Sequence, residues 1–127
     1  MKILLDSCAL VDIAIGASSL TEEAKALFED TENEIFVSSA SIWELGLKKS
    51  LGKLDFDVDG AVALFSDLGI KVLDVTLSVV LLVNKLPYHH KDPFDRVIIA
   101  TAKQEGMTVV TSDAVFADYA LDIILSR

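Results

Sequence analysis

Four acidic residues that lie far apart in the chain hold positions from which they could act together. Asp6 ends an apolar run near the N-terminus, and Asp113 lies two residues beyond another apolar run. Glu44 and Asp95 fall in the first turns of two segments with helical patterning. Ligands of an open parallel sheet bind just beyond the carboxyl ends of its strands. If the apolar runs are parallel strands, we therefore expect all four carboxylates to meet at that edge.

A cluster of this kind favours a bound metal ion. Two carboxylates about 5 Å apart repel each other by about 3 kcal/mol at an effective dielectric constant of about 20. Either some of them are protonated or a divalent cation lies among them. Oxygen ligands without Cys or His at zinc-site spacing favour Mg²⁺ or Mn²⁺ over zinc. Carboxylates that hold such ions suit phosphodiester hydrolysis, in which the metal activates a water and neutralises charge on the phosphate.

Each of these acids also has a purely structural interpretation. Asp6 could form the turn after a strand, and Glu44 could complete a helix capping box. Asp92, which is followed by proline, is expected to cap a helix. Asp95 comes three residues later, in the first turn of that helix, where the helix dipole favours any acidic residue. Asp113 could cap a short helix. The functional interpretation rests on the convergence of all four.

The elements that must position these acids alternate between strands and helices. Strands are expected at residues 2–6, 34–37, 70–75, 107–111 and 121–125, and helices at 8–15, after the capping box 19–22, from Ser38 or Ser39 to Lys49, at 59–68, at 93–106 and briefly after Asp113. Residues 76–86 fit a strand or a buried helix, and the need for a crossover favours the helix. This alternation predicts an α/β domain with a mostly parallel sheet of about five strands.

Length and composition narrow the function further. The chain has 127 residues, which is one ordinary domain, and 52% of them are hydrophobic, with a mean hydropathy of +0.48. The net charge of −9 excludes nucleic-acid binding by bulk electrostatics, so contact with phosphates would run through metal ions and a few local lysines. A single cysteine, Cys8, excludes an internal disulfide, and no apolar stretch approaches membrane-spanning length. We expect a cytoplasmic protein with no membrane association.

Several segments carry a family resemblance. They are, in chain order, LDSCAL at 5–10, VSSASIWELGLK at 37–48, LGKL at 51–54, LPYHHKDPFDRVIIA at 86–100 and VTSD at 110–113. They resemble the PIN-domain family, and most closely the VapC-type toxins of bacterial type II toxin–antitoxin systems. The resemblance covers essentially the whole chain, and the segment 86–100 is highly specific. The family more often has threonine and histidine where this chain has Ser7 and Cys8.

The resemblance implies a three-layer α/β/α fold over a single domain, residues 1–127. It implies an endoribonuclease that depends on Mg²⁺ or Mn²⁺, forms homodimers and has a cognate antitoxin. The acidic positions of the family fall on Asp6, Glu44, Asp95 and Asp113. In this interpretation Asp6 and Asp95 hold the metal directly, Glu44 does so directly or through water, and Asp113 completes the site. Hydrolysis would leave a 5′-phosphate and a 3′-hydroxyl.

Other residues receive secondary roles. Ser7 and Thr111 are expected to orient carboxylates by hydrogen bonds. Candidates for contact with the RNA backbone are Lys48, Lys49, Lys91 and Arg96, although a lysine at a helix end also complements the helix dipole. For His89 and His90, a solvated loop or a structural hydrogen bond is favoured over catalysis. Trp43 is expected in the core or an interface rather than as a platform for base stacking, and Cys8 as a small buried hydrophobe.

Two other functions remain open at this point. A phosphoacceptor receiver domain would have a similar length and an acidic Mg²⁺ pocket, with Asp74 as the acceptor at the end of the third strand. A non-catalytic interaction module would use its acids only as helix caps. The apolar run Val11–Ile15 is too broad for one buried helix stripe. With Leu20, Leu27, Phe28 and Ile42 it is expected to wall a groove for an antitoxin segment.

Overall fold

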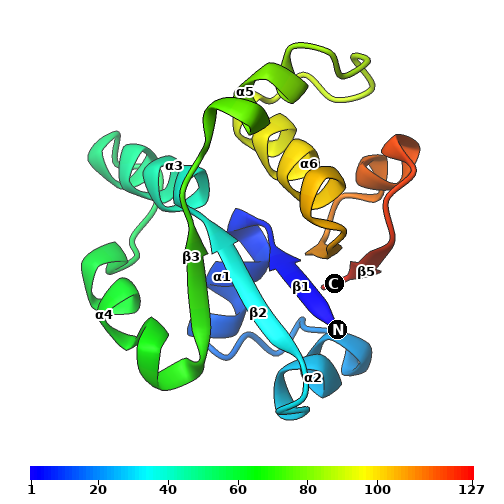
Figure 1. Ribbon diagram of the computed structural model, residues 1–127. Coiled ribbons are helices and arrows are strands. Elements are labelled where there is room, and N and C mark those ends of the chain that lie inside the picture. The colour runs from blue at the N-terminus through cyan, green and yellow to red at the C-terminus, as the bar shows by residue number, and fades with distance from the viewer.

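The expected strands form one parallel sheet between two layers of helices (Figure 1). The computed structural model describes all residues, 1–127. The strands are β1 (Lys2–Leu5), β2 (Glu34–Ser38), β3 (Ile70–Leu73), β4 (Thr108–Thr111) and β5 (Ile123–Leu125). Their order across the sheet is β3-β2-β1-β4-β5, and every neighbouring pair is parallel. The predicted α/β/α fold is confirmed, with a sheet that is entirely rather than mostly parallel.

The helices begin at residues that can cap them. They are α1 (Ser7–Ala14), α2 (Glu22–Glu29), α3 (Ser39–Ser50), α4 (Val58–Leu68), α5 (Leu77–Val83), α6 (Pro93–Glu105) and the short 3₁₀ helix η1 (Ala114–Tyr119). The segment that fitted either a strand or a helix is helix α5, which begins after the cap Thr76. Helix α4 begins two residues earlier than a helix capped by Asp59 would. Its cap is Asp57, which accepts the N–H of Gly60, so Asp59 lies in the first turn.

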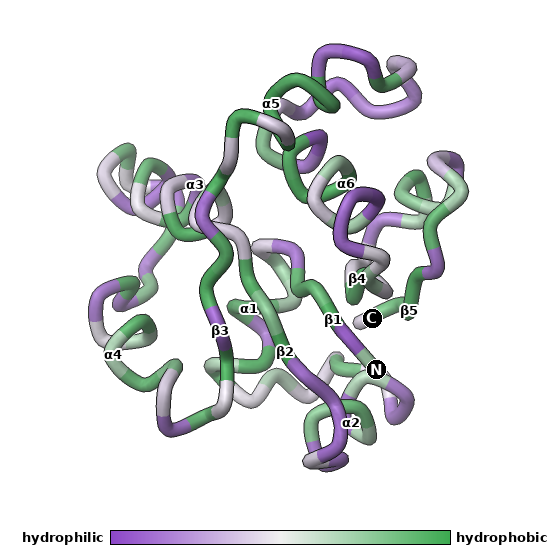
Figure 2. Tube along the Cα trace, viewed as in Figure 1, coloured by the Kyte–Doolittle hydropathy of each residue, from purple (hydrophilic) through white to green (hydrophobic).

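Strand alternation divides the core into two. Ile3 and Leu5 face one side of β1, where they pack with residues of α1, α2, α3 and α4. Leu4 faces the other side, with residues of α5, α6 and η1. Successive side chains of a strand point to opposite faces of the sheet, and helices cover both faces. The inner strands therefore consist mainly of apolar residues without a polar alternation. Figure 2 shows hydrophobic residues along β1 and β2 after the first, polar residue of each strand.

The strand order defines one special position at the edge of the sheet. From β1 the chain moves outward through β2 to β3, then returns through α5 and α6 to β4 on the other side of β1. The order therefore reverses between β1 and β4, and a crevice forms at the carboxyl ends of strands where such a reversal occurs. The backbone N–H of Asp6 donates to the carbonyl of Val110 at 3.1 Å, which keeps the two strands paired up to this point.

The same order contradicts the receiver alternative. Asp74 follows β3, which is an edge strand separated from β1 by β2. An acceptor at that position would lie two strands away from Asp6 instead of beside it.

None of the helices combines the length and the apolar character needed to cross a membrane.

Candidate active site

Asp6 lies at the reversal point as both a helix cap and a buried acid. It is 5% exposed, and its Oδ1 accepts the N–H of Ala9 at 2.8 Å, which caps α1. Its Oδ2 accepts the hydroxyl of Thr111 at 2.6 Å. Burial raises the pKa of Asp6. The two hydrogen bonds oppose this change, and the nearby charges of Glu44 and Asp113 add to it. Asp6 is thus an acid in a site that stabilises its charge incompletely.

Glu44 reaches the site from α3. It is 5% exposed and accepts a short hydrogen bond from the hydroxyl of Ser7. Its other oxygen pairs with the ammonium of Lys48, one turn further along the helix, at 3.1 Å. Helix α3 is capped by Ser38, so Glu44 lies beyond the first turn and the capping-box interpretation of this residue is wrong. Ser7 and Thr111 orient carboxylates, as predicted.

Asp95 is the third residue of α6, and the cap Asp92 accepts its backbone N–H at 3.0 Å. Its own carboxylate is free to turn towards the site, where Oδ2 lies 3.0 Å from Nε2 of His90. The pKa of Asp95 is raised to about 7. The cause is first burial and then the charge of Asp92, with His90 opposing and the more distant acids Glu44 and Asp6 adding. Burial and the neighbouring carboxylates thus both disfavour the ionised form of Asp95.

Asp113 combines the two roles considered for it. Its Oδ1 accepts the N–H of Val115 and so caps η1, while its Oδ2 lies 3.0 Å from Nε2 of His90. Its backbone N–H donates to Oγ1 of Thr111. The same threonine hydroxyl therefore links Asp113 to Asp6. The capping interpretation is correct but incomplete, because the second oxygen faces the site.

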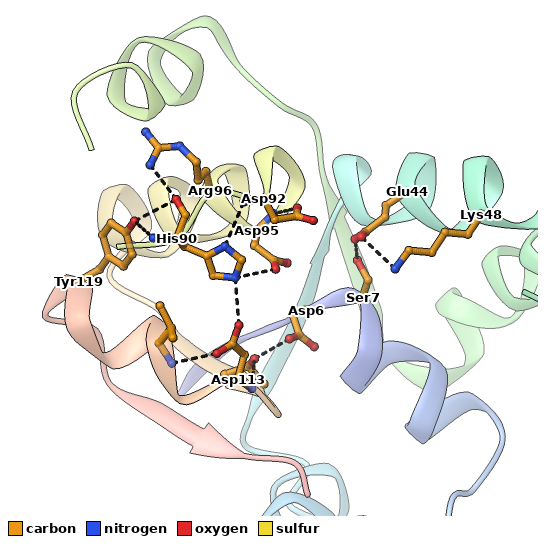
Figure 3. A network of polar contacts seen from close by, with 12 residues as sticks. Asp6, Ser7, Glu44, Lys48, His90, Asp92, Asp95, Arg96, Asp113 and Tyr119 are labelled. Carbon is orange, nitrogen blue, oxygen red and sulfur yellow. Dashed lines mark hydrogen bonds and ion pairs between the residues drawn. The ribbon is translucent and has the colours of Figure 1, made fainter. Parts of the chain in front are cut away.

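The structure therefore brings all four predicted acids to one edge of the sheet (Figure 3). Asp6 directly follows β1, Asp113 follows β4 by two residues and Asp95 lies in the first turn of α6, while Glu44 approaches from α3 beside Ser7. Ligand atoms of His90, Asp95 and Asp113 lie within 4.8 Å of one another. The predominance of carboxylate oxygens fits a hard divalent cation such as Mg²⁺ or Mn²⁺. Burial first and neighbouring acids second raise the pKa values of Asp6 and Asp95, and a bound cation would favour the ionised form of both carboxylates.

His90 joins the site although it was not among the predicted site residues. Its side chain is 15% exposed and lies between two of the acids, so the solvated-loop interpretation is wrong and the hydrogen-bonding alternative is correct. The available signal was its position two residues before the capping Asp92. That spacing lets the ring accept the N–H of Asp92 and reach back over the start of α6. His89, by contrast, is exposed and makes an edge contact with Tyr119.

Three other assignments need correction. Arg96 is 4% exposed and donates four hydrogen bonds to backbone carbonyls, so it is a structural residue and not an RNA contact. Cys8 is exposed rather than buried: it is the second residue of α1, whose buried residues are Ser7, Ala9, Leu10 and Asp12. Trp43 is 67% exposed and meets Phe94 edge to face, which excludes the core alternative and leaves the interface alternative. Lys49 and Lys91 are exposed, as a contact role requires.

An apolar hollow lies beside Trp43. Its volume is about 450 Å³, and it is lined by Ser39, Ala40, Trp43, Val75, Val80, Pro93, Phe94 and Val97. These residues come from α3, α5, α6 and the segment after β3. The hollow shares two helices with the acid site, but it contains none of the four acids.

Comparison with known proteins identifies the family. The sequence profile of the PIN domain matches residues 3–121, so the chain belongs to the PIN-domain family. Comparison with curated protein sequences gives no match.

Solved structures support the same fold. The chain is similar to VapBC2 from Rickettsia felis, solved with promoter DNA, with a TM-score of 0.76, 18% identity and 100% of both chains covered. It is also similar to DNA-bound VapBC from Salmonella typhimurium, with a TM-score of 0.67, 20% identity and 98% of each chain covered. A third similar structure is VapC20 of Mycobacterium tuberculosis, described as a sarcin-ricin-loop-cleaving toxin. Its TM-score is 0.68 and its identity 15%, with 94% of this chain and 95% of that chain covered.

Proposed function

We propose that this protein is a metal-dependent endoribonuclease that acts in the cytoplasm as the toxin of a type II toxin–antitoxin pair. The observation that carries the proposal is the meeting of Asp6, Glu44, Asp95 and Asp113 at the reversal point of a PIN-domain sheet. Similarity to toxin structures, including one described as cleaving the sarcin-ricin loop, supports the choice of RNA as substrate.

The acids would hold Mg²⁺ or Mn²⁺, with Asp6 and Asp95 as direct ligands. When bound, such an ion supplies Lewis acidity that activates water and neutralises charge on the phosphodiester. The protein's own groups keep the ligands in place: Thr111 fixes one oxygen of Asp6, and Ser7 fixes one oxygen of Glu44. Lys48 lies beside Glu44, where its ammonium can contact a phosphate of the RNA. Partial burial lowers the pKa of Lys48, but the hydrogen bond and charge of Glu44 outweigh it and leave the pKa raised.

The decisive experiment is RNA cleavage by purified protein with mapping of 5′-ends. We expect Mn²⁺- or Mg²⁺-dependent products with a 5′-phosphate and a 3′-hydroxyl. Asp6→Asn should abolish cleavage, while Asp118→Asn, an exposed acid outside the site, should leave it unchanged. Near-normal cleavage by the Asp6 variant would refute the site. A protein whose thermal stability does not respond to either metal would instead be a non-catalytic interaction module.

The antitoxin surface proposed from the sequence needs partial revision. Leu20, Leu27, Phe28 and Ile42 pack against the core and are only partly exposed, so they offer less surface to a partner than Ile15 does. Ile15 is 63% exposed at the end of α1, close to a small apolar recess between α1 and α4. Exposed leucines of α4, Leu64 and Leu68, line the same recess. We propose that an apolar antitoxin segment covers this part of the surface.

Antitoxin binding can be tested with one exposed variant and one control. Ile15→Asp should weaken the complex with the cognate antitoxin at least tenfold, as measured by calorimetry. Lys85→Asp, which changes an exposed residue beyond α5, should have little effect. Unchanged affinity of a folded Ile15 variant would place the antitoxin elsewhere.

We propose a homodimer formed through α3 and α5. Apolar side chains gather there: Trp43, Leu77, Val80 and Leu81 are all more than 40% exposed, and the hollow beside Trp43 lies among them. An apolar surface of this kind marks a protein interface more often than a solvated face. Val80→Asp should convert a dimer into a monomer in light scattering, whereas Val62→Asp on α4 should not. A monomeric wild-type protein would refute the assignment.

A further inference from the structure

The loop that carries His90 is held by a buried arginine. The guanidinium of Arg96 donates to the carbonyls of Val83 and Leu86 through one nitrogen, and to those of Pro87 and His90 through the other. These four carbonyls span the end of α5 and the whole turn before α6. Charged donors make stronger hydrogen bonds than neutral ones. The path of the backbone up to His90 is therefore fixed from within the protein.

A tyrosine fixes the same residue from the other side. The backbone N–H of His90 donates to the hydroxyl oxygen of Tyr119 at 2.7 Å, and that hydroxyl donates to the carbonyl of Pro87 at 2.7 Å. The imidazole packs edge-on against Phe116, which is fully buried. Figure 3 shows the ring between Tyr119 and the acids. Neither the backbone nor the ring of His90 is free to leave the site without breaking these contacts.

The hydrogen bonds of the ring determine which nitrogen carries the proton. The backbone N–H of Asp92 donates to Nδ1 at 3.1 Å, so the lone pair of Nδ1 is occupied and this nitrogen bears no hydrogen. The proton of the imidazole is therefore on Nε2. Nε2 lies 3.0 Å from Oδ2 of both Asp95 and Asp113 and donates to this pair of carboxylates.

We propose that His90 is a positioning residue of the metal site: its Nε2–H holds Asp95 and Asp113 together, and the ring itself is not a metal ligand. This inference rests on the proposed function, because it assigns the residue that prepares that site. A histidine that ligates a metal offers an unprotonated nitrogen and donates its other N–H to an acceptor. Here the other nitrogen faces a donor, so Nε2 cannot be freed for a metal without losing the bond from Asp92.

The arrangement has two consequences. Without a donor between them, the facing oxygens of Asp95 and Asp113 would repel and move apart, because each lies about one hydrogen-bond length from the same nitrogen. His90 also leaves the ligand set composed of oxygen atoms alone, which favours Mg²⁺ or Mn²⁺ over Zn²⁺. The spacing of His90, Asp95 and Asp113 thus resembles that of a histidine–carboxylate metal site. The difference is that Nε2 of His90, the nitrogen facing the acids, carries a proton.

The test measures Mn²⁺ binding without RNA, by electron paramagnetic resonance of the free ion. His90→Leu should weaken binding about 10- to 100-fold, the usual cost of losing a residue that orients ligands. His90→Gln should recover most of the affinity, because its side-chain amide places an N–H near the position of Nε2. His89→Gln is the matched control, since His89 is the neighbouring exposed histidine, and it should bind Mn²⁺ like the wild type.

A second measurement needs no variant. Pulsed electron paramagnetic resonance of the Mn²⁺-loaded wild-type protein should lack the coupling of a directly bound imidazole nitrogen. Detection of that coupling, or normal affinity in folded His90→Leu, would overturn the inference while the proposed nuclease stands. A wild-type protein that binds no Mn²⁺ would refute the proposed function, and this inference with it.

Discussion

Replacing Asp95 by asparagine should stabilise the metal-free protein, even though it should destroy the proposed activity. The substitution removes a negative charge from a crowded site and changes almost no volume. Asp95 has a pKa raised to about 7, mainly by burial and by the charge of Asp92. Above that pH, the folded wild-type protein must keep an ionised carboxylate where its neutral form is favoured. Asparagine is neutral at every pH.

The sign and the size of the effect follow from linkage. The folded state binds a proton at Asp95 more readily than the unfolded state does, so stability falls as pH rises from about 4 to about 7. A pKa moved from 3.8 to about 7 corresponds to at most about 4 kcal/mol, at about 1.4 kcal/mol per pH unit. We expect about half of this, about 2 kcal/mol, because the side chain is 23% exposed and partly screened by solvent.

The assay is urea unfolding in chelator at a series of pH values. At pH 8, Asp95→Asn should be more stable than the wild type by about 2 kcal/mol, or about 8 °C in melting temperature for a domain of this size. The difference should shrink towards zero near pH 4. Comparing the two proteins at each pH cancels the other titrating groups, and Asp118→Asn reports any general effect of lost charge. A variant that is less stable than the wild type at pH 8 would show that the charge of Asp95 is well compensated without metal, contrary to the argument.

Three further outcomes are expected. Thr111→Val, which removes the hydroxyl bound to Asp6, should cost about 1 to 2 kcal/mol in urea unfolding and should slow RNA cleavage about tenfold; unchanged cleavage would deny that the hydroxyl orients Asp6. Arg96→Lys should destabilise the protein by about 2 kcal/mol in urea unfolding, because buried carbonyl groups lose their hydrogen-bond donors. A variant of unchanged stability but weakened RNA affinity would show that Arg96 contacts RNA after all. RNA affinity measured by fluorescence anisotropy should collapse in chelator, since the net charge is −9, whereas tight metal-free binding that falls steeply with monovalent salt would indicate a basic-patch binder.

The sequence by itself determined the layout of the fold and the meeting of the four acids. Strand alternation, helix caps such as Asp92 and the order of the elements are local or topological properties. Because parallel strands place their carboxyl ends at one edge of the sheet, Asp6 and Asp113 were expected at the same edge. The pairing of β1 with β4, which sets them side by side, is a property of the tertiary structure. The helices that follow β2 and α5 then brought Glu44 and Asp95 to the same edge.

Only the tertiary structure decided the roles of the residues between those elements. His90 and Arg96 occur in the same segment; the sequence left His90 between a solvated loop and a structural hydrogen bond, and it suggested an RNA contact for Arg96. Their roles depend on how the turn before α6 closes, because Arg96 binds carbonyls up to 13 positions away and His90 meets an acid 23 positions away. Trp43 and Cys8 likewise each had a plausible place in the core, and packing left both exposed. A sequence pattern specifies which residues can be buried. The partners of a side chain across a loop are selected only when the whole chain folds, because many alternative contacts compete until then.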